Sequence, residues 1–280
     1  MGDLDAWLRG ALPRERIVER RQLTGGHSNH NELLRTERGH RYVLRRYRGT
    51  NACAKEAALA ARLAGIVPVP EVVAADPAAG VLLSRFVPGA PIALEPFAVG
   101  ETLARIGSVT FPTPGFFQAA LVPDEAEPTA GLDAWVDRCL REGNADGHLT
   151  AAERARLLRY ASAATDDLRV LAGARQLVHA DYNPKNLVAG PGGTVAAVLD
   201  WEFAFSSSPL FDIGNMLRDP RPDGFAAAFV AGFAAGGGEL PPNWRELSRA
   251  LDLYSLADFL TRPVAHPYFA RAITRIRALG

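Results

Sequence analysis

Apolar and polar residues follow a strand-like pattern in the first third of the chain. Short apolar runs separated by Gly, Pro and polar residues continue to about residue 86, which is typical of a small sheet. A short amphipathic helix is predicted before it, near residues 3–12. We expect strands at residues 17–23, 33–36, 42–45, 71–75 and 81–86. The short segment 37–39, which ends in Gly39, has the size of a hairpin loop, so the first three strands should be antiparallel.

One helix interrupts this sheet, and a linker follows it. At residues 52–64 apolar residues recur at helical spacing, and Gly65 and Pro68 should end the helix. Two prolines and a glycine at residues 87–91 indicate a linker. We therefore expect two lobes, residues 1–86 and 87–280.

The second lobe shows mainly helical periodicity. Helices are predicted at residues 96–108, 132–141, 151–172, 225–234, 244–260 and 268–279. One β-patterned stretch interrupts them, with strands at 176–179, 186–189 and 195–199 and a glycine-rich turn at 190–193. The predicted fold class is α+β, with a small antiparallel sheet followed by a mainly helical lobe.

Composition and charge narrow the class of partner. The chain has 280 residues, 48% of them hydrophobic, and equal numbers of basic and acidic residues, 31 of each. Because the basic residues are scattered, we expect neither nucleic acid nor a membrane surface as partner. There is no long apolar run and no signal-like N-terminus, so a cytoplasmic protein with a small-molecule partner is expected. Cys53 and Cys139 are expected to be reduced thiols. An oligomeric state cannot be inferred.

The residues that favour a specific chemistry surround the predicted hairpin. Asn186 at the start of one strand and Asp200 after the end of its partner should face each other at the open end, where strands lie about 5 Å apart. Mg²⁺ prefers such hard oxygen ligands together with nucleotide phosphates. Asp181 lies just upstream, close enough to accept a proton from a hydroxyl group. An ordinary polar hairpin end is the alternative.

Residues 179–186, His-Ala-Asp-Tyr-Asn-Pro-Lys-Asn, and the later Asp200 resemble motifs of the aminoglycoside phosphotransferase family and its choline-kinase-like relatives. The resemblance covers nearly the whole chain and implies a protein-kinase-like, two-lobed fold. By this resemblance Asp181 is the catalytic carboxylate, and Asn186 and Asp200 bind Mg²⁺. His179 and Asp212 would be structural, and Asp212 would brace the catalytic loop.

The first lobe agrees with this resemblance and implies ATP or GTP as the phosphoryl donor. Arg45 occupies the place of the phosphate-binding lysine of protein kinases, and Glu56 is its expected ion-pair partner. An exposed surface pair is the alternative. The remaining residues expected to contact the nucleotide are those of a glycine-containing loop, Gly25, Gly26, Ser28 and Asn29, and those of the segment before the linker, Ser84, Arg85 and Phe86.

Acceptor-binding residues are less well defined by the sequence. Trp201 and Glu202 adjoin Asp200, where they would either line an acceptor pocket or pack against the hairpin. Tyr254 and Asp258 lie on a late helix that also carries Asp252, and an exposed helix face is the alternative to an acceptor role. Lys185 is expected to be exposed, as a variable position of the family.

The favoured function is phosphorylation of a hydroxyl group on an antibiotic (aminoglycoside, nucleoside or similar) or on a related metabolite. A metabolite kinase of choline, homoserine or sugar type is one alternative, and a catalytically silent nucleotide-binding module is another. A protein kinase is disfavoured because no Ala-Pro-Glu motif with a long activation segment follows Asp200.

Overall fold

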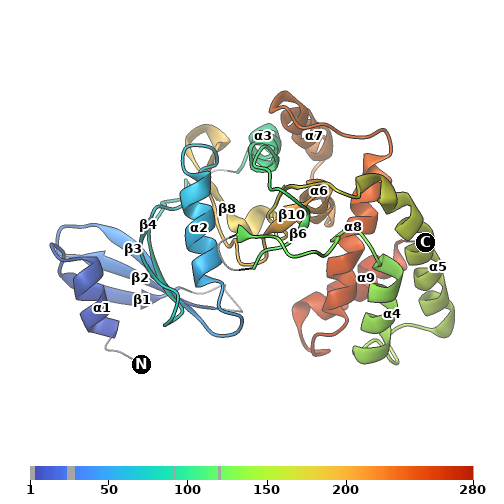
Figure 1. The fold of residues 1–280 in the computed structure, drawn as a ribbon, viewed down its shortest axis with the longest axis horizontal. Coiled ribbons are helices and arrows are strands. Elements are labelled where there is room, and N and C mark those ends of the chain that lie inside the picture. The colour runs from blue at the N-terminus through green and yellow to red at the C-terminus, as the bar shows by residue number, and fades with distance from the viewer. Residues whose placement is uncertain (1–3, 24–28, 91–92, 119–120, 280) are drawn as a thin grey trace.

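The first lobe is a five-stranded antiparallel sheet in the order β1-β2-β3-β5-β4 (Figure 1). The computed structural model describes residues 4–23, 29–90, 93–118 and 121–279. The strands are β1 (Ile17–Gln22), β2 (Asn29–Thr36), β3 (Arg41–Tyr47), β4 (Val72–Asp76) and β5 (Val81–Arg85). All five predicted strands are confirmed. β2 begins earlier than predicted, so Asn29 lies on a strand and not in the preceding loop.

Two helices accompany this sheet, and they belong to different cores. Helix α1 (Leu4–Ala11) packs Leu8 against the strand residues Leu34, Leu44 and Leu83. Helix α2 (Cys53–Leu63) instead places Leu59 and Leu63 in the large core that it shares with the second lobe. Figure 1 shows α2 between the sheet and the helical lobe. The helix that carries Glu56 is therefore anchored to both lobes.

The second lobe is mainly helical, as predicted. Its helices are α3 (Pro96–Gly107), α4 (Leu132–Glu142), α5 (Ala151–Asp167), α6 (Leu210–Leu217), α7 (Phe225–Ala235), α8 (Trp244–Phe259) and α9 (Pro267–Arg277). One small sheet has the order β6-β10-β7, with β6 (Gly115–Phe116), β10 (Phe205–Ser207) and β7 (Gln176–Val178). The predicted hairpin is formed by β8 (Leu187–Ala189) and β9 (Val195–Val198).

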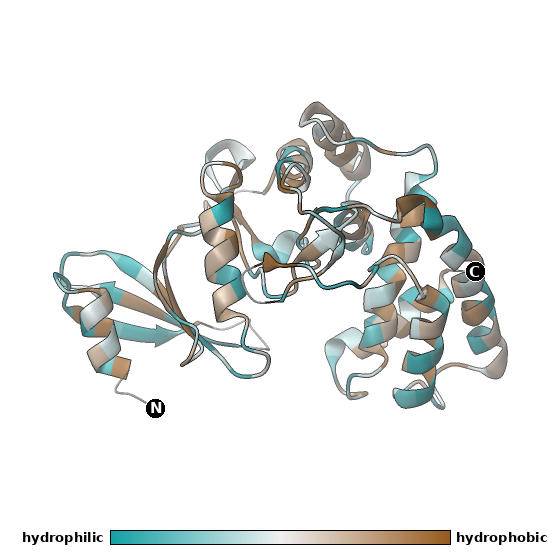
Figure 2. Cartoon of the chain, in the orientation of Figure 1, coloured by the Kyte–Doolittle hydropathy of each residue, from teal (hydrophilic) through white to brown (hydrophobic). Residues whose placement is uncertain are grey.

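The amphipathic pattern that predicted these helices reflects burial on one side. In α4 the buried residues are Leu132, Val136, Cys139 and Leu140, at the spacing of one helix face. Figure 2 shows both hydrophilic and hydrophobic residues along α4, α5 and α8. Helix α5 ends at Asp167, earlier than predicted, and a 3₁₀ turn (Leu168–Leu171) continues it.

Helix α6 was not predicted, and the reason is its burial. Most of its residues are buried, among them Ile213, Gly214 and Met216. A short helix that is surrounded by protein lacks the alternation of exposed and buried positions on which the sequence pattern depends. The two-residue strand β6 and the three-residue strand β10 are too short for a pattern of their own.

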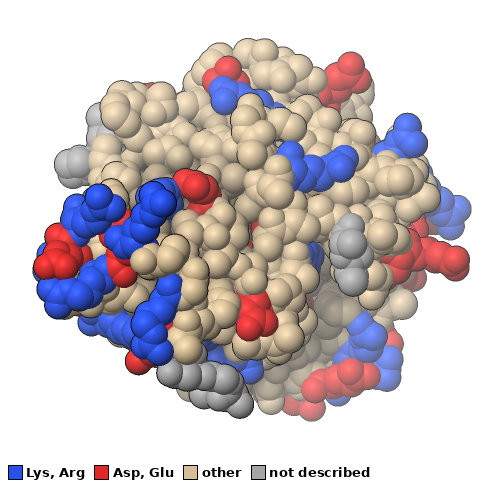
Figure 3. Space-filling model, turned by 60° about the vertical axis from the view of Figure 1, so that its left-hand side comes forward, with Lys and Arg blue, Asp and Glu red and all other residues tan. Residues whose placement is uncertain are grey.

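Charges of both signs lie together on the surface of the first lobe (Figure 3). Arg16 pairs with Glu37 at 2.8 Å, and Arg35 pairs with Glu19 at 2.7 Å. These arginines are therefore partly neutralised by neighbouring carboxylates. Among the described residues, no helix has the length and the apolar character needed to cross a membrane.

Candidate active site

The β8–β9 hairpin brings Asn186 and Asp200 to its open end. Leu187 pairs with Val198, and one step further the Leu199 N–H donates to the Asn186 carbonyl at 2.8 Å. Asp200 follows with a left-handed backbone at φ 70°. This conformation is unfavourable for a residue with a Cβ, and such strain is often found at functional sites. The predicted placement of Asn186 and Asp200 at one end of the hairpin is confirmed.

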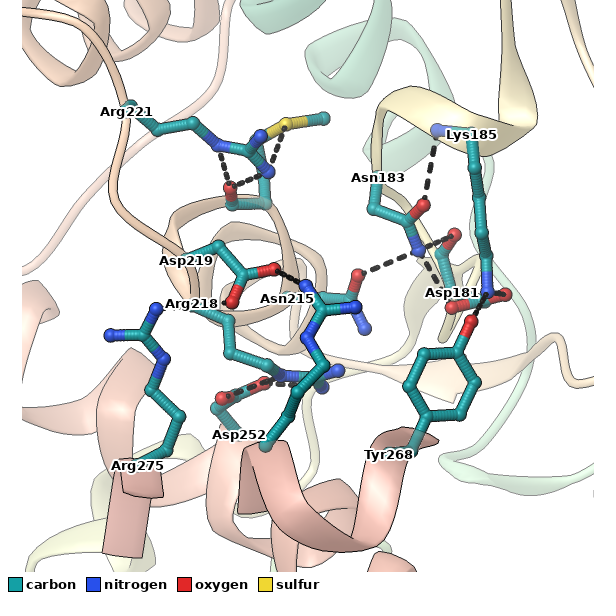
Figure 4. A network of polar contacts seen from close by, with 12 residues as sticks. Asp181, Asn183, Lys185, Asn215, Arg218, Asp219, Arg221, Asp252, Tyr268 and Arg275 are labelled. Atoms are coloured by element: carbon teal, nitrogen blue, oxygen red, sulfur yellow. Dashed lines mark hydrogen bonds and ion pairs between the residues drawn. The ribbon is translucent and has the colours of Figure 1, made fainter. Parts of the chain in front are cut away.

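The carboxylate of Asp181 is held by three side chains from its own loop, and Figure 4 shows two of them, Asn183 and Lys185. Asn183 Nδ2 donates to Oδ1 at 2.7 Å, and Asn186 Nδ2 donates to Oδ2 at 2.8 Å. Lys185 Nζ lies 3.0 Å from Oδ2. Because Asn186 donates through its nitrogen, its Oδ1 remains the oxygen with which it can bind a cation.

Lys185 is exposed, as expected, but its contact with Asp181 was not predicted. Its Nζ also lies 3.2 Å from the hydroxyl oxygen of Tyr268, at the start of α9. Partial burial opposes the charge of Lys185, but Asp181 outweighs it and raises the pKa of the ammonium group. Lys185 therefore stays charged beside Asp181 throughout the neutral range.

His179 and Asp212 brace this loop from inside the protein. Asp212 is fully buried and accepts from the backbone N–H groups of His179 at 2.7 Å and Ala180 at 2.8 Å. Burial raises the pKa of Asp212 to about 7. His179 is also fully buried, where Nε2 contacts the Leu199 carbonyl at 2.8 Å and Nδ1 accepts from the Asp181 N–H at 3.2 Å. Burial lowers the pKa of His179.

Arg45 joins the two lobes through two carboxylates. Its Nη1 donates to Glu56 at 2.7 Å and to Asp200 at 2.8 Å. The side chains of Arg45 and Glu56 are only 14% and 10% exposed, so this is not a solvated surface pair. Burial opposes the charge of Arg45, but Glu56 and Asp200 together raise its pKa.

A cluster of carboxylates around Arg45 provides a fit for a divalent cation. Ligand oxygens of Glu56, Asp200 and Glu202 all lie within 4.8 Å of one another. Burial, with Asp200 nearby, raises the pKa of Glu56 to about 7 and also raises that of Glu202. Arg45 and the neighbouring Lys55 balance part of the charge of these carboxylates. Hard oxygen donors of this kind suit Mg²⁺.

Two cavities meet at these residues. The smaller, of about 280 Å³, lies between the sheet and the hairpin, and the larger, of about 1120 Å³, opens towards the helical lobe. Arg45, Asn186 and Asp200 line both cavities, whereas Asp181 lines the larger one. The charged centre therefore separates two binding spaces and is accessible from each.

The residues expected to bind the nucleotide base line the smaller cavity, but some of their polar groups are already engaged. Ser84, Arg85 and Phe86 all contribute to its wall. The Arg85 N–H donates to the Glu71 carbonyl at 2.8 Å, and the Phe86 N–H donates to the Arg41 carbonyl at 3.1 Å.

Of the predicted phosphate-contacting loop, only one residue is described. Gly25, Gly26 and Ser28 lie outside the described residues. Asn29 lines the larger cavity, and its Nδ2 donates to Glu202 at 2.7 Å.

The residues predicted to bind the acceptor lie in different places in the structure. Glu202, Tyr254 and Asp258 line the larger cavity. Trp201 is buried, lines the smaller cavity and lies with its ring centroid 4.5 Å from that of His179. Asp252 is buried and forms an ion pair with Arg218 at 2.6 Å (Figure 4), so it does not contribute to the acceptor wall.

The sequence interpretation missed most of the wall of the larger cavity. Aromatic residues and arginines from several distant segments line it, among them Phe116, Phe203, Phe205, Phe211, Trp135 and Arg138. The only local signal was the concentration of three phenylalanines between residues 203 and 211. Lys55, next to Glu56, also lines this cavity.

Several solved structures share the fold of this chain. The aminoglycoside phosphotransferase APH(4)-Ia is 18% identical, with a TM-score of 0.69 over 99% of this chain and 97% of that one. The macrolide 2'-phosphotransferase MphH from Brachybacterium faecium is 18% identical, with a TM-score of 0.68 over 100% and 98%. A choline/ethanolamine kinase family protein from Mesorhizobium loti is 21% identical, with a TM-score of 0.63 over 93% and 92%. The fold is that of kinase-like phosphotransferases.

The family itself is given by the sequence match. Residues 19–248 match the model of the phosphotransferase enzyme family APH, and the chain belongs to this family. Comparison with curated proteins found no match. The protein is a small-molecule phosphotransferase, which confirms the resemblance inferred from residues 179–186 and Asp200.

Proposed function

We propose that this protein transfers the γ-phosphoryl group of ATP or GTP to a hydroxyl group of an antibiotic or a related metabolite. The observation that carries the proposal is the position of Arg45, Asn186 and Asp200 between two cavities. A phosphoryl group held there is open to a nucleotide on one side and to an acceptor beside Asp181 on the other.

The smaller cavity suits the nucleotide base. Aliphatic residues from both lobes line it, including Val43, Leu82 and Val198. Such a narrow apolar space favours a flat ring, with a few polar groups at its edge for orientation. The N–H groups of Arg85 and Phe86 are used within the sheet. Base recognition would therefore depend on backbone groups near Val87, which also lines this cavity.

One related protein was crystallised with nucleotides, which supports this donor. Structures of APH(4)-Ia variants are ternary complexes of hygromycin B with ADP or with AMP-PNP. In our chain Arg45 would contact the phosphates. Asn186 and Asp200 would hold Mg²⁺, which neutralises charge on the phosphates when it is bound.

Asp181 would orient the acceptor and take its proton. The hydroxyl oxygen attacks the γ-phosphorus while the bond to the bridging β-phosphate oxygen breaks, and the nucleoside diphosphate leaves. The hydroxyl proton passes to Asp181. Positioning and electrostatic stabilisation supply most of the rate enhancement in such a reaction. A silent nucleotide-binding module would have no use for a carboxylate held by Asn183, Lys185 and Asn186.

The substitution Asp181→Asn tests the proposal. It keeps the size of the side chain but removes the proton acceptor, so transfer should fall by about 10³-fold or more while nucleotide affinity stays within about threefold. The acceptor is first identified by a mass-shift screen over antibiotics and metabolites. Transfer is then measured as nucleoside diphosphate formation. Asp166→Asn, on an exposed face of α5, is the matched control. Undiminished turnover in Asp181→Asn would refute the assignment.

A further inference from the structure

The wall of the larger cavity beyond Asp181 is a continuous row of aromatic rings. Phe116 lies 5.1 Å from Phe205, which lies 5.0 Å from Phe211, measured between ring centroids. Phe211 is in turn 5.9 Å from Tyr254, and Tyr254 is 6.4 Å from Trp135. These rings come from β6, β10, α6, α8 and α4, and all five line the cavity. The acceptor space thus has one extended apolar side.

Part of this wall is open to solvent. Phe116 is 47% exposed, and Phe203, which also lines the cavity, is 51% exposed. Exposed aromatic surface that is grouped inside a cavity marks a binding site for an apolar surface, because its burial by a ligand is favourable.

The carboxylates of this cavity are already engaged. Glu127 Oε1 accepts from the Thr129 hydroxyl at 2.8 Å, and Glu127 Oε2 accepts from the Gly173 N–H at 2.9 Å. Asp258 pairs with Arg262 at 3.1 Å. The other carboxylates lining the described part of the cavity are Asp181, Asp200 and Glu202, whose contacts with the catalytic centre are given above.

Arginines that line the same cavity make it still less favourable for a ligand with several positive charges. Arg138, Arg141 and Arg262 line the cavity, and the Arg138 guanidinium lies 4.4 Å from the centre of the Trp135 ring. Arg141 pairs with Asp137 at 2.9 Å and Arg262 pairs with Asp258 at 3.1 Å, so their charge is partly balanced. A ligand with several amino groups would meet these guanidinium groups and would have to compete for every carboxylate. An uncharged or anionic ligand would avoid both costs.

From this wall we infer that the acceptor is an uncharged or singly anionic alcohol with an extended apolar ring face, and not a polyamine such as an aminoglycoside. The inference rests on the proposed function, since the acceptor hydroxyl is taken to face Asp181. The ring face of this alcohol lies on the aromatic row. The arginines favour a hydrogen-bond-accepting group or a negative charge at the edge of the ring face. A cavity of about 1120 Å³ has room for several rings.

Binding of 8-anilinonaphthalene-1-sulfonate tests the inference without any turnover. This probe is an aromatic anion with no alcohol group, and its fluorescence rises when it is bound in an apolar site. Phe203→Glu and Arg138→Glu should each weaken its binding by about tenfold, because each adds a negative charge to the wall. Phe97→Glu, at a residue that is 47% exposed on α3 and outside the cavity, is the matched control and should leave binding unchanged.

The result that overturns the inference is equal probe affinity in the three variants and the parent chain. Hygromycin B, a polyamine alcohol, gives a second test. It should neither displace the probe nor be phosphorylated, and either result would contradict the inference. The proposed function would be contradicted by a different result, namely that no alcohol is phosphorylated in a reaction that depends on Asp181. Probe binding does not depend on that reaction, so the two failures can be distinguished.

Discussion

Lys185 is the only cation in direct ion-pair contact with Asp181 among the described residues. It is half exposed, and an exposed ion pair contributes only about 0.2–1 kcal/mol to stability. Its effect on positioning is expected to be larger, because it fixes the carboxylate oxygen that Asn186 also contacts.

Replacing Lys185 by Ala should therefore lower kcat by roughly tenfold, with little change in the nucleotide KM. The melting temperature should change little. Steady-state kinetics and thermal unfolding measure the two effects. Tyr268→Phe removes the hydroxyl that contacts Lys185 but keeps the ring, so its effect should be smaller. A large stability loss with unchanged kcat would show a merely structural role.

Asp212 gives a prediction about pH. Burial raises its pKa from 3.8 to about 7, so the folded protein binds this proton more tightly than the unfolded chain. Its contribution to stability is complete below about pH 4 and is lost as the pH rises through about 7.

Asp212→Asn should lower stability, because its amide NH₂ would replace one of the two oxygens that accept from the His179 and Ala180 N–H groups. In the parent protein the free energy of unfolding should fall by about 3 kcal/mol between about pH 5 and pH 8 because Asp212 loses its proton. In Asp212→Asn this fall should be absent. Urea unfolding of both proteins at several pH values measures the difference. Parallel pH profiles would contradict the assigned pKa.

At the scale of elements, α3 and α7 approach each other closely through glycines. A Cβ on Gly100 would overlap the Phe229 carbonyl oxygen, and one on Gly232 would overlap the Phe97 carbonyl oxygen. Tyr182, next to Asp181, donates its hydroxyl to the Val99 carbonyl on α3 at 2.7 Å. Helix α3, held in place by α7, therefore contacts the loop that carries Asp181.

Gly100→Ala should destabilise the protein by about 2 kcal/mol or more, because backbone atoms of α7 would have to move. Gly10→Ala is the control, since a Cβ there meets nothing within 4 Å. In helix α1 that change should be neutral or stabilising by up to about 1 kcal/mol. Chemical denaturation of the two variants tests the contrast. Equal changes in stability for the two variants would show that α3 and α7 are not in close contact at Gly100.

At the scale of the whole molecule, the two lobes are joined by hydrogen bonds at the candidate active site. Arg45 on β3 reaches Asp200 beyond β9, and Asn29 on β2 reaches Glu202. Arg45 also donates through Nε to Asn31 at 3.2 Å. A lysine could supply the charge, but its three donors lie on one nitrogen and cannot take the positions of both Nε and Nη1.

Arg45→Lys should raise the nucleotide KM by about tenfold, and Arg45→Met should raise it by about 100-fold or more, because Met leaves Glu56 and Asp200 without a counter-charge. Nucleotide titrations followed by calorimetry or kinetics measure both. Equal affinity in Arg45→Met would exclude Arg45 from nucleotide binding.

Local patterns were sufficient for much of the fold and for the centre of the site. The strands of the first lobe, the β8–β9 hairpin and the pairing of Arg45 with Glu56 were predicted from short segments and from resemblance to the family. Helix α6 was missed because it is buried, and Trp201 proved to be a buried residue beside His179. Both depend on contacts with segments far along the chain.

The sequence by itself determined which chemical groups are present and their local spacing. A hairpin with Asn186 at one end and Asp200 at the other follows from a few neighbouring residues, because turn and strand preferences are local. Only the tertiary structure decided which groups share a cavity. The aromatic row from Phe116 to Trp135 requires five elements to converge, and no local preference contains that information. Long-range packing therefore decided the shape and charge of the larger cavity, which are properties that short motifs do not encode.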